Sequence, residues 1–300
     1  MCGIVGYIGS KGATSLLLEG LKRLEYRGYD SAGIAMTNGN GLETRKAKGK
    51  ISQLESLVSL HPIHGSVGIA HTRWATHGQP NECNAHPHTD CTKTIAVVHN
   101  GIIENYGALR TMLKQQGHTF VSETDTEVLA HLIEAAFDGK LEDAVIDALN
   151  LVEGTYGIAV ISENDPNKIV CARKGSPLLI GLGDGEYFVA SDVAAILQHT
   201  RQVVYLDDGE MGVITPDGYE VLDLNARRIS KGVSRIDWSL DEIEKGGYDH
   251  FMLKEICEQP QTIQNTMLGR LVVEEGFSKL GGLNLSKQEL LAIDHVAISA

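Results

Sequence analysis

MCGIVGYIGS, residues 1–10, places a cysteine directly after the initiator methionine and ahead of a short apolar run. A run of this length bounded by glycines predicts a buried strand rather than a mobile charged tail. Methionine aminopeptidases remove Met1 when the second side chain is small, as that of Cys2 is. Cys2 would then carry a free α-amine, whose pKa of about 8 lets it accept a proton near neutral pH. One residue would therefore supply both a nucleophile and its base.

The composition describes an acidic globular chain. Its 300 residues are 42% hydrophobic and 22% charged, which is enough apolar material for a sizeable core. The net charge of −13 repels phosphate backbones and anionic membrane surfaces, so we expect neither a nucleic-acid nor a membrane partner. The sequence shows no secretion signal and no apolar run approaching the roughly 20 residues that span a bilayer. We therefore predict a cytoplasmic protein.

The five cysteines are odd in number and irregularly spaced, which argues against a disulfide framework. One stretch, CNAHPHTDC, gathers thiols and imidazoles that could hold zinc, at Cys83, His86, His88 and Cys91. Its spacing departs from the usual zinc-binding pairs, so a zinc module remains the alternative interpretation. We expect no metal and no cofactor.

The pattern of elements favours an α+β fold. Amphipathic helices are expected near residues 14–28 and 51–61 and in three segments over 105–152, and a hairpin is expected at 31–49. A dense block of short strands follows over 154–223. Strands joined by hairpins, with helices in separate groups, favour antiparallel sheets over a doubly wound fold. No glycine-rich nucleotide-binding motif is present at a strand-to-helix turn.

Two residues at the end of the run TIAVVHNG could stabilise an oxyanion. An asparagine side chain beside a backbone N–H is a common donor pair in acyl transfer, and Asn100 and Gly101 offer one. The simpler interpretation is that His99, Asn100 and Gly101 only form a turn.

Two further residues suit a zwitterionic amino-acid substrate. Arg73 ends the apolar run SVGIAHTR and could grip a carboxylate with paired hydrogen bonds. Asp125 could hold an ammonium group, although by itself it would more simply cap the helix that follows. Only the combination of these residues favours a substrate site.

Five ordered stretches resemble one family: RLEYRGYDSAG (23–33), HTRWATHG (71–78), NAHPH (84–88), HNGIIEN (99–105) and SETDTE (122–127). Together with the opening MCGI, they are similar to class II (N-terminal nucleophile) glutamine amidotransferases, and most of all to the glucosamine-6-phosphate synthase branch. The resemblance covers about the first 240 residues. It implies the Ntn-hydrolase fold, a four-layer αββα sandwich of two mostly antiparallel sheets.

The resemblance also implies a role for each matching residue. Cys2 would attack the side-chain amide of L-glutamine and form a γ-glutamyl thioester, and Asn100 with Gly101 would form the oxyanion hole. The remaining positions would bind substrate or lie near the nucleophile. They are Arg73 and Asp125 for the carboxylate and ammonium, Trp74, Thr76 and His77 beside them, and Arg27 with Gly28 near Cys2.

The resemblance divides the chain into a glutaminase domain, residues 2–240, and a linker with the truncated start of a sugar-phosphate isomerase domain, residues 241–300. Fructose 6-phosphate would bind only to the missing isomerase domains, which would use the released ammonia to make glucosamine 6-phosphate. We expect a homodimer for a full-length protein of this kind and a monomer for this fragment.

Two other functions compete with this one. A retained Met1 would block the amine of Cys2 and leave a silent glutamine-binding module. A self-processing N-terminal nucleophile peptidase is the other alternative, and the pairing of Arg73 with Asp125 argues against it.

Overall fold

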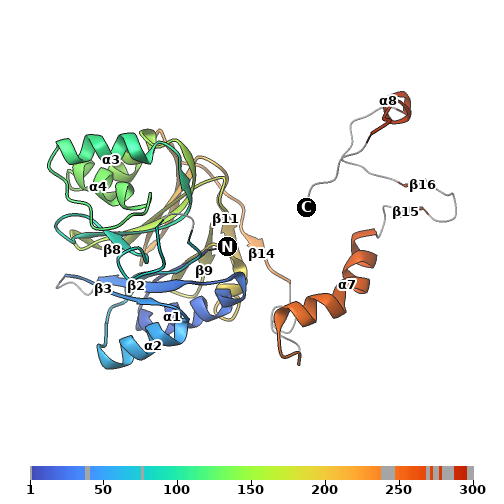
Figure 1. Ribbon diagram of the computed structural model, residues 1–300, viewed down its shortest axis with the longest axis horizontal. Helices are drawn as coiled ribbons and strands as arrows, with labels where there is room; N and C mark the ends of the chain where they lie inside the picture. Colours follow the sequence, from blue (N-terminus) through green and yellow to red (C-terminus); the bar gives the residue numbers. More distant parts are fainter. Residues whose placement is uncertain are drawn as a thin grey trace. The chain divides into compact units, whose positions relative to one another are not determined.

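The computed structural model describes residues 2–37, 41–75, 78–237, 247–267, 271–272, 277–278 and 287–295. The chain divides into two compact units, Met1–Leu240 and Asp241–Ala300. Two stacked sheets with helices on their outer faces make up the first unit. Figure 1 shows α1 (Ala13–Leu24) and α2 (Ile51–Leu60) on one side of the sheets and α3 (Tyr106–Gln115) and α4 (Glu127–Ala136) on the other.

The first sheet has eight strands, and every pairing within it is antiparallel. In spatial order the strands are β14 (Ser234–Arg235), β11 (Gln202–Tyr205), β9 (Leu179–Leu182), β10 (Tyr187–Ala190), β1 (Gly3–Ile8), β4 (Val67–Arg73), β2 (Ser31–Thr37) and β3 (Leu42–Lys48). The opening apolar run thus becomes a central strand.

The second sheet has six strands and is also antiparallel throughout. Its order is β13 (Gly218–Asp223), β12 (Glu210–Thr215), β8 (Asp165–Lys174), β7 (Gly154–Ser162), β6 (Ile95–Ile103) and β5 (His88–Thr89). The long pairing of β6 with β7 sets Asn100 opposite Gly157.

The first unit contains the following helices and 3₁₀ turns in its described residues. They are α1 (Ala13–Leu24) with the 3₁₀ turn η1 (Glu25–Arg27), α2 (Ile51–Leu60), α3 (Tyr106–Gln115), α4 (Glu127–Ala136), α5 (Leu141–Asn150) and the 3₁₀ turn η2 (Val193–Ala195). One buried cluster, which includes Val97, Leu129 and Val145, packs α3, α4 and α5 on the second sheet. A second cluster, which includes Ile4, Ile69 and Val98, fills the space between the two sheets.

Strand β1 is buried along its whole length because it is covered on both faces. Ile4 and Ile8 belong to the core between the sheets. Val5 points to the opposite face of the sheet and packs on Gly20 of α1. A Cβ added at Gly20 would lie 2.9 Å from Cγ1 of Val5. Burying an aliphatic side chain of this size contributes about 1.5–3 kcal/mol, so residues of both faces hold the strand next to Cys2 in place.

The architecture confirms the expected α+β class and the two antiparallel sheets with helices outside them. The hairpin expected at 31–49 is β2 and β3, while the turn at 38–40 lies outside the described residues. The helix expected at 14–28 ends earlier, at Leu24, and continues only as η1.

The second unit contains α7 (Phe251–Met267), the paired strands β15 (Leu271–Val272) and β16 (Phe277–Ser278), and α8 (Lys287–Leu291). Helix α7 includes Pro260. The segment HVAISA, interpreted from the sequence as the start of a strand, lies outside the described residues beyond His295.

Candidate active site

The register of two central strands positions Cys2. Antiparallel pairing of β1 with β4 sets Gly3 opposite Thr72, so Cys2 comes beside the residues at the end of β4. The backbone N–H of Trp74 donates a hydrogen bond to Cys2 Sγ at 3.1 Å. The thiol is therefore held at the end of β4 although 72 residues separate the two partners in the chain.

Burial raises the pKa of the Cys2 thiol, while the Trp74 N–H acts in the opposite direction. Asp30 raises this pKa further and Arg73 lowers it. A thiol with a raised pKa is protonated at neutral pH, and only the thiolate is a strong nucleophile. Chemistry at Cys2 therefore requires a base close to its sulfur.

Asn100 and Gly101 reach the same place from the second sheet. Asn100 Nδ2 donates to the backbone carbonyl oxygen of Cys2 at 3.2 Å. Gly101 adopts φ 138°, and a Cβ there would lie 2.1 Å from the carbonyl oxygen of Thr155. The backbone at this position thus has no room for a side chain. An amide donor and a glycine backbone stand beside the thiol-bearing residue.

A buried histidine sets the orientation of the Asn100 amide. His71 of β4 has its Nε2 2.9 Å from Asn100 Oδ1. Burial lowers the pKa of His71 to about 3, so its ring is neutral. A neutral imidazole that donates from Nε2 fixes the amide oxygen on its own side and leaves Nδ2 toward Cys2. The bond joins the two sheets directly behind the candidate nucleophile.

Arg73 and Asp125 both line the cavity beside Cys2. Arg73 is buried, forms an ion pair with Asp30 at 3.7 Å, and donates to the carbonyl oxygen of Gly78 at 3.3 Å. Asp125 Oδ2 accepts from the backbone N–H of Ile103 at 2.8 Å. Asp125 directly precedes Thr126, the N-cap of α4.

Arg27 and Gly28 also lie at the cavity, Arg27 in its lining and Gly28 against Trp74. Arg27 ends η1, lines the cavity and pairs with Asp192 at 3.3 Å. Gly28 has φ 97°, and a Cβ there would lie 2.3 Å from Cε3 of Trp74. The half-exposed indole thus packs directly on the Gly28 backbone, and this contact sets the position of Trp74 over the cavity.

The cavity has a volume of about 460 Å³, which suits a small polar molecule. It contains seven of the residues singled out from the sequence, namely Cys2, Arg27, Arg73, Trp74, Asn100, Gly101 and Asp125. An eighth, Gly28, contacts Trp74 at its edge. Thr76 and His77 lie outside the described residues, as does Met1.

The alternative zinc set at positions 83–91 is wrong as a single site. His86 Nε2 is 2.9 Å from Thr126 Oγ1, and His88 Nε2 is 3.0 Å from Thr124 Oγ1. Cys83 and Cys91 are exposed. Among the described residues, no group able to hold a metal ion contains Cys83, His86 or His88.

Sequence reasoning assigned no role at the cavity to four buried histidines, two of which, His86 and His99, line it. Besides His71, they are His86, His88 and His99, and burial lowers the pKa of each of these three. Thr126 Oγ1 links His86 Nε2 to His99 Nδ1, with both distances at 2.9 Å. The sequence could have pointed to these histidines, because each lies within or beside a motif that had already been identified.

None of the helices in the described part of the chain combines the length and apolar character that crossing a bilayer requires.

Comparison with known proteins agrees with this geometry. A family model described as a glutamine amidotransferase domain matches residues 71–198. A glutamine--fructose-6-phosphate aminotransferase (isomerizing) of Chlorobaculum tepidum is 55% identical over 291 residues, which are 95% of this chain and 47% of that protein. The enzyme of the same name from Clostridium perfringens is 50% identical over 300 residues, 100% of this chain and 49% of that protein. The chain thus spans about half the length of the curated relatives it matches.

Solved structures lead to the same family. The glutamine phosphoribosylpyrophosphate amidotransferase from B. subtilis superimposes with a TM-score of 0.65 at 30% identity, over 74% of this chain and 49% of that one. A class-II glutamine aminotransferase domain protein from Silicibacter pomeroyi, at 18% identity and a TM-score of 0.50, shares the fold. The chain therefore contains a glutamine amidotransferase domain, and over its length it is similar to about half of the glutamine--fructose-6-phosphate aminotransferases.

Proposed function

We propose that the cavity at Cys2 hydrolyses the side-chain amide of L-glutamine and releases ammonia. The observation that carries this proposal is the convergence of a thiol, an amide donor, a guanidinium and a carboxylate on one cavity of about 460 Å³. Arg73 would bind the glutamine carboxylate and Asp125 its ammonium group, which directs the amide carbon toward Cys2 Sγ. Because binding holds the amide carbon next to the sulfur, the two react as they would within one molecule.

The first half of the reaction forms the thioester. The α-amine of Cys2, free once Met1 is removed, takes the thiol proton, and the sulfur attacks the amide carbon. Asn100 Nδ2 and the backbone N–H of Gly101 stabilise the negative charge on the amide oxygen. The ammonium of Cys2 then returns its proton to the leaving nitrogen, so ammonia departs and a γ-glutamyl thioester remains.

Water completes the reaction. The amine of Cys2, now neutral again, takes a proton from a water molecule that attacks the thioester carbon. The same oxyanion donors stabilise the second intermediate, which collapses to glutamate and free thiol. A base on the nucleophilic residue itself suits this site, because burial raises the pKa of the Cys2 thiol. His71 and His99, which are buried beside the cavity, have lowered pKa values and are held by other partners.

The wider assignment rests on the relatives. Residues 2–240 would form the glutaminase domain and residues 241–300 a linker with the start of an isomerase domain, which accords with the two compact units. In a full-length protein the ammonia would serve to make glucosamine 6-phosphate from fructose 6-phosphate. Such a protein would be a cytoplasmic homodimer, and this fragment a monomer.

One experiment tests both the nucleophile and its base. Glutamate release is measured for the parent chain, for Cys2→Ala, and for a chain with a lysine inserted between Met1 and Cys2. The bulky lysine keeps Met1 in place, so the thiol remains while its amine is blocked. We expect activity only in the parent. Its intact mass should show the loss of one methionine, and acid quenching during turnover should add the mass of one glutamyl group. Parent-like turnover in either altered chain would refute the mechanism.

A further inference from the structure

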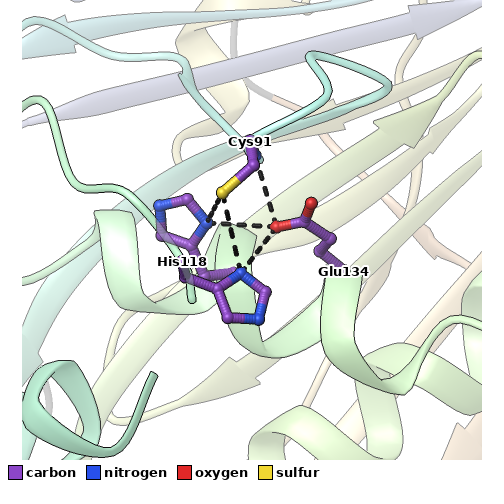
Figure 2. A group of neighbouring side chains, drawn as sticks. Cys91, His118 and Glu134 are labelled. Atoms are coloured by element: carbon purple, nitrogen blue, oxygen red, sulfur yellow. Dashed lines mark hydrogen bonds and ion pairs between the residues drawn. The ribbon is translucent and has the colours of Figure 1, made fainter. Parts of the chain in front are cut away.

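Four side chains of metal-binding type meet at a place that glutamine hydrolysis does not use. Their ligand atoms, Cys91 Sγ, His118 Nδ1, His131 Nδ1 and a Glu134 carboxylate oxygen, all lie within 4.8 Å of one another. We call them the Cys91 cluster. Figure 2 shows Cys91, His118 and Glu134 pointing toward one another, with the sulfur facing the ring nitrogens.

The spacing of these atoms fits a tetrahedral ion. Cys91 Sγ is 3.7 Å from His118 Nδ1 and 3.5 Å from His131 Nδ1. Glu134 Oε2 is 2.9 Å from His118 Nδ1 and 3.2 Å from His131 Nδ1. A zinc ion at about 2.3 Å from sulfur and about 2.0 Å from nitrogen or oxygen separates sulfur and nitrogen ligands by about 3.5 Å, and nitrogen and oxygen ligands by about 3.3 Å.

The residues around the cluster orient its ligands. His131 is buried, and its Nε2 faces Glu127 Oε1 at 3.7 Å. Glu127 is itself fixed, because Oε1 accepts from Val121 N at 2.7 Å and Oε2 from Ser122 N at 2.8 Å. The Glu127 carboxylate on that side of the ring favours the proton on Nε2, which leaves Nδ1 for a metal. The Thr119 N–H points at Cys91 Sγ from 3.4 Å.

We propose that the Cys91 cluster binds one zinc ion as a structural site. Thiolate, imidazole and carboxylate together suit zinc and exclude the hard cations Mg²⁺ and Ca²⁺, which prefer oxygen alone. Four protein ligands complete a tetrahedron, so no position remains for a reacting water. On binding, the thiol proton and any proton on either Nδ1 pass to solvent.

The proposed ion joins three segments that are separate in the chain. Cys91 lies between β5 and β6, His118 follows α3, and His131 and Glu134 lie one turn apart on α4. The same helix begins just after Asp125, which lines the cavity. Zinc would therefore stabilise the part of the fold that carries Asp125 without touching the reacting atoms.

Zinc binding is tested on the purified 300-residue chain after treatment with a chelator and dialysis. All samples carry Cys2→Ala, so that zinc cannot be held by the candidate nucleophile. We expect one zinc per chain by elemental analysis, and an affinity that falls at least about 100-fold in Cys91→Ser or His118→Ala. Cys83→Ser is the matched control, an exposed cysteine outside the cluster, and should bind zinc like its parent.

Two further measurements report the geometry and the structural role. Cobalt should give the intense visible bands of a tetrahedral ion with a thiolate charge-transfer band, both absent in Cys91→Ser. Zinc at a thousandfold excess over its Kd should raise Tm by on the order of 10 °C, and the same excess of magnesium should not. Substoichiometric zinc, an octahedral cobalt spectrum, or equal binding by parent and Cys91→Ser would overturn the proposal.

Discussion

The buried histidines beside the cavity predict a steep loss of stability in mild acid. His71 is fully buried, and burial lowers its pKa to about 3, whereas an unfolded chain restores a pKa of about 6.5. Below pH 6.5 the unfolded chain binds a proton at this residue that the folded protein does not. The free energy of unfolding must therefore decrease as the pH falls from about 6.5 toward 3.

The size of the effect follows from the width of that interval. Each pH unit is equivalent to about 1.4 kcal/mol, and pH 5 lies about 1.5 units below the unfolded pKa, so His71 alone costs about 2 kcal/mol. Burial also lowers the pKa of His86 and His88 well below 6.5, so these two act in the same direction. The contribution of about 2 kcal/mol from His71 alone is already a sizeable part of the 5–15 kcal/mol that typically stabilises a domain. His131 opposes this trend: although burial lowers its pKa, Glu127 and Glu134 raise it overall.

The assay is urea unfolding followed by circular dichroism at pH 7 and pH 5. His71→Gln removes the titrating group and keeps an amide donor for Asn100 Oδ1. We expect the decrease in unfolding free energy between the two pH values to be about 2 kcal/mol smaller in this variant than in the parent. His61→Gln, at an exposed position, serves as the control and should keep the parent slope. An unfolding free energy that stays constant from pH 7 to 5, or an unchanged slope in His71→Gln, would refute the reasoning.

Three further predictions concern the cavity; the first two are measured by steady-state glutamate release and the third by tryptophan fluorescence. Arg73→Lys should raise the KM for glutamine about 10- to 100-fold, because an ammonium cannot reproduce the guanidinium fork; an unchanged KM would place the carboxylate elsewhere. Asn100→Ala should lower kcat about 10²- to 10³-fold with little change in KM, and a pure KM effect would contradict its role as an oxyanion donor. Gly28→Ala should displace the Trp74 indole and change its fluorescence, because the new Cβ would lie 2.3 Å from Cε3. Gly117 has a similar φ of 99° and nothing within 4 Å of an added Cβ, so Gly117→Ala is the control; an equal fluorescence change there would contradict a specific contact between residue 28 and the indole.

The sequence predicted the fold well where local patterns and the family motifs agree. The apolar run after Cys2 becomes the central strand β1, and the hairpin signal at 31–49 becomes β2 and β3. The helix expected to end at Gly28 was placed too long, because the chain tightens into η1 after Leu24 and brings Arg27 to the cavity. Such an end depends on tertiary contacts, here the pairing of Arg27 with Asp192.

The motifs also predicted most of the cavity, but not the residues that hold it together. Asn100 was identified from its neighbours in sequence, whereas its partner His71 is 29 residues away and belongs to the other sheet. That hydrogen bond exists only because β4 and β6 face each other across the core between the sheets. A pattern within one strand carries no information about which side chain faces it from the opposite sheet.

The proposed zinc ligands show that spacing in the sequence can also group residues that do not meet in the fold. Spacing alone grouped Cys91 with His86 and His88, two histidines a few residues before it. Both of those imidazoles are directed to threonines at the start of α4, Thr126 and Thr124. Cys91 instead meets side chains 27 to 43 residues further along the chain, His118 and His131 through its sulfur and Glu134 through its backbone N–H. Ligand spacing is informative when one short loop supplies the ligands, as in zinc fingers. A site assembled from a loop, a helix end and a helix face has no such spacing, so it is found only from the distances between the folded side chains.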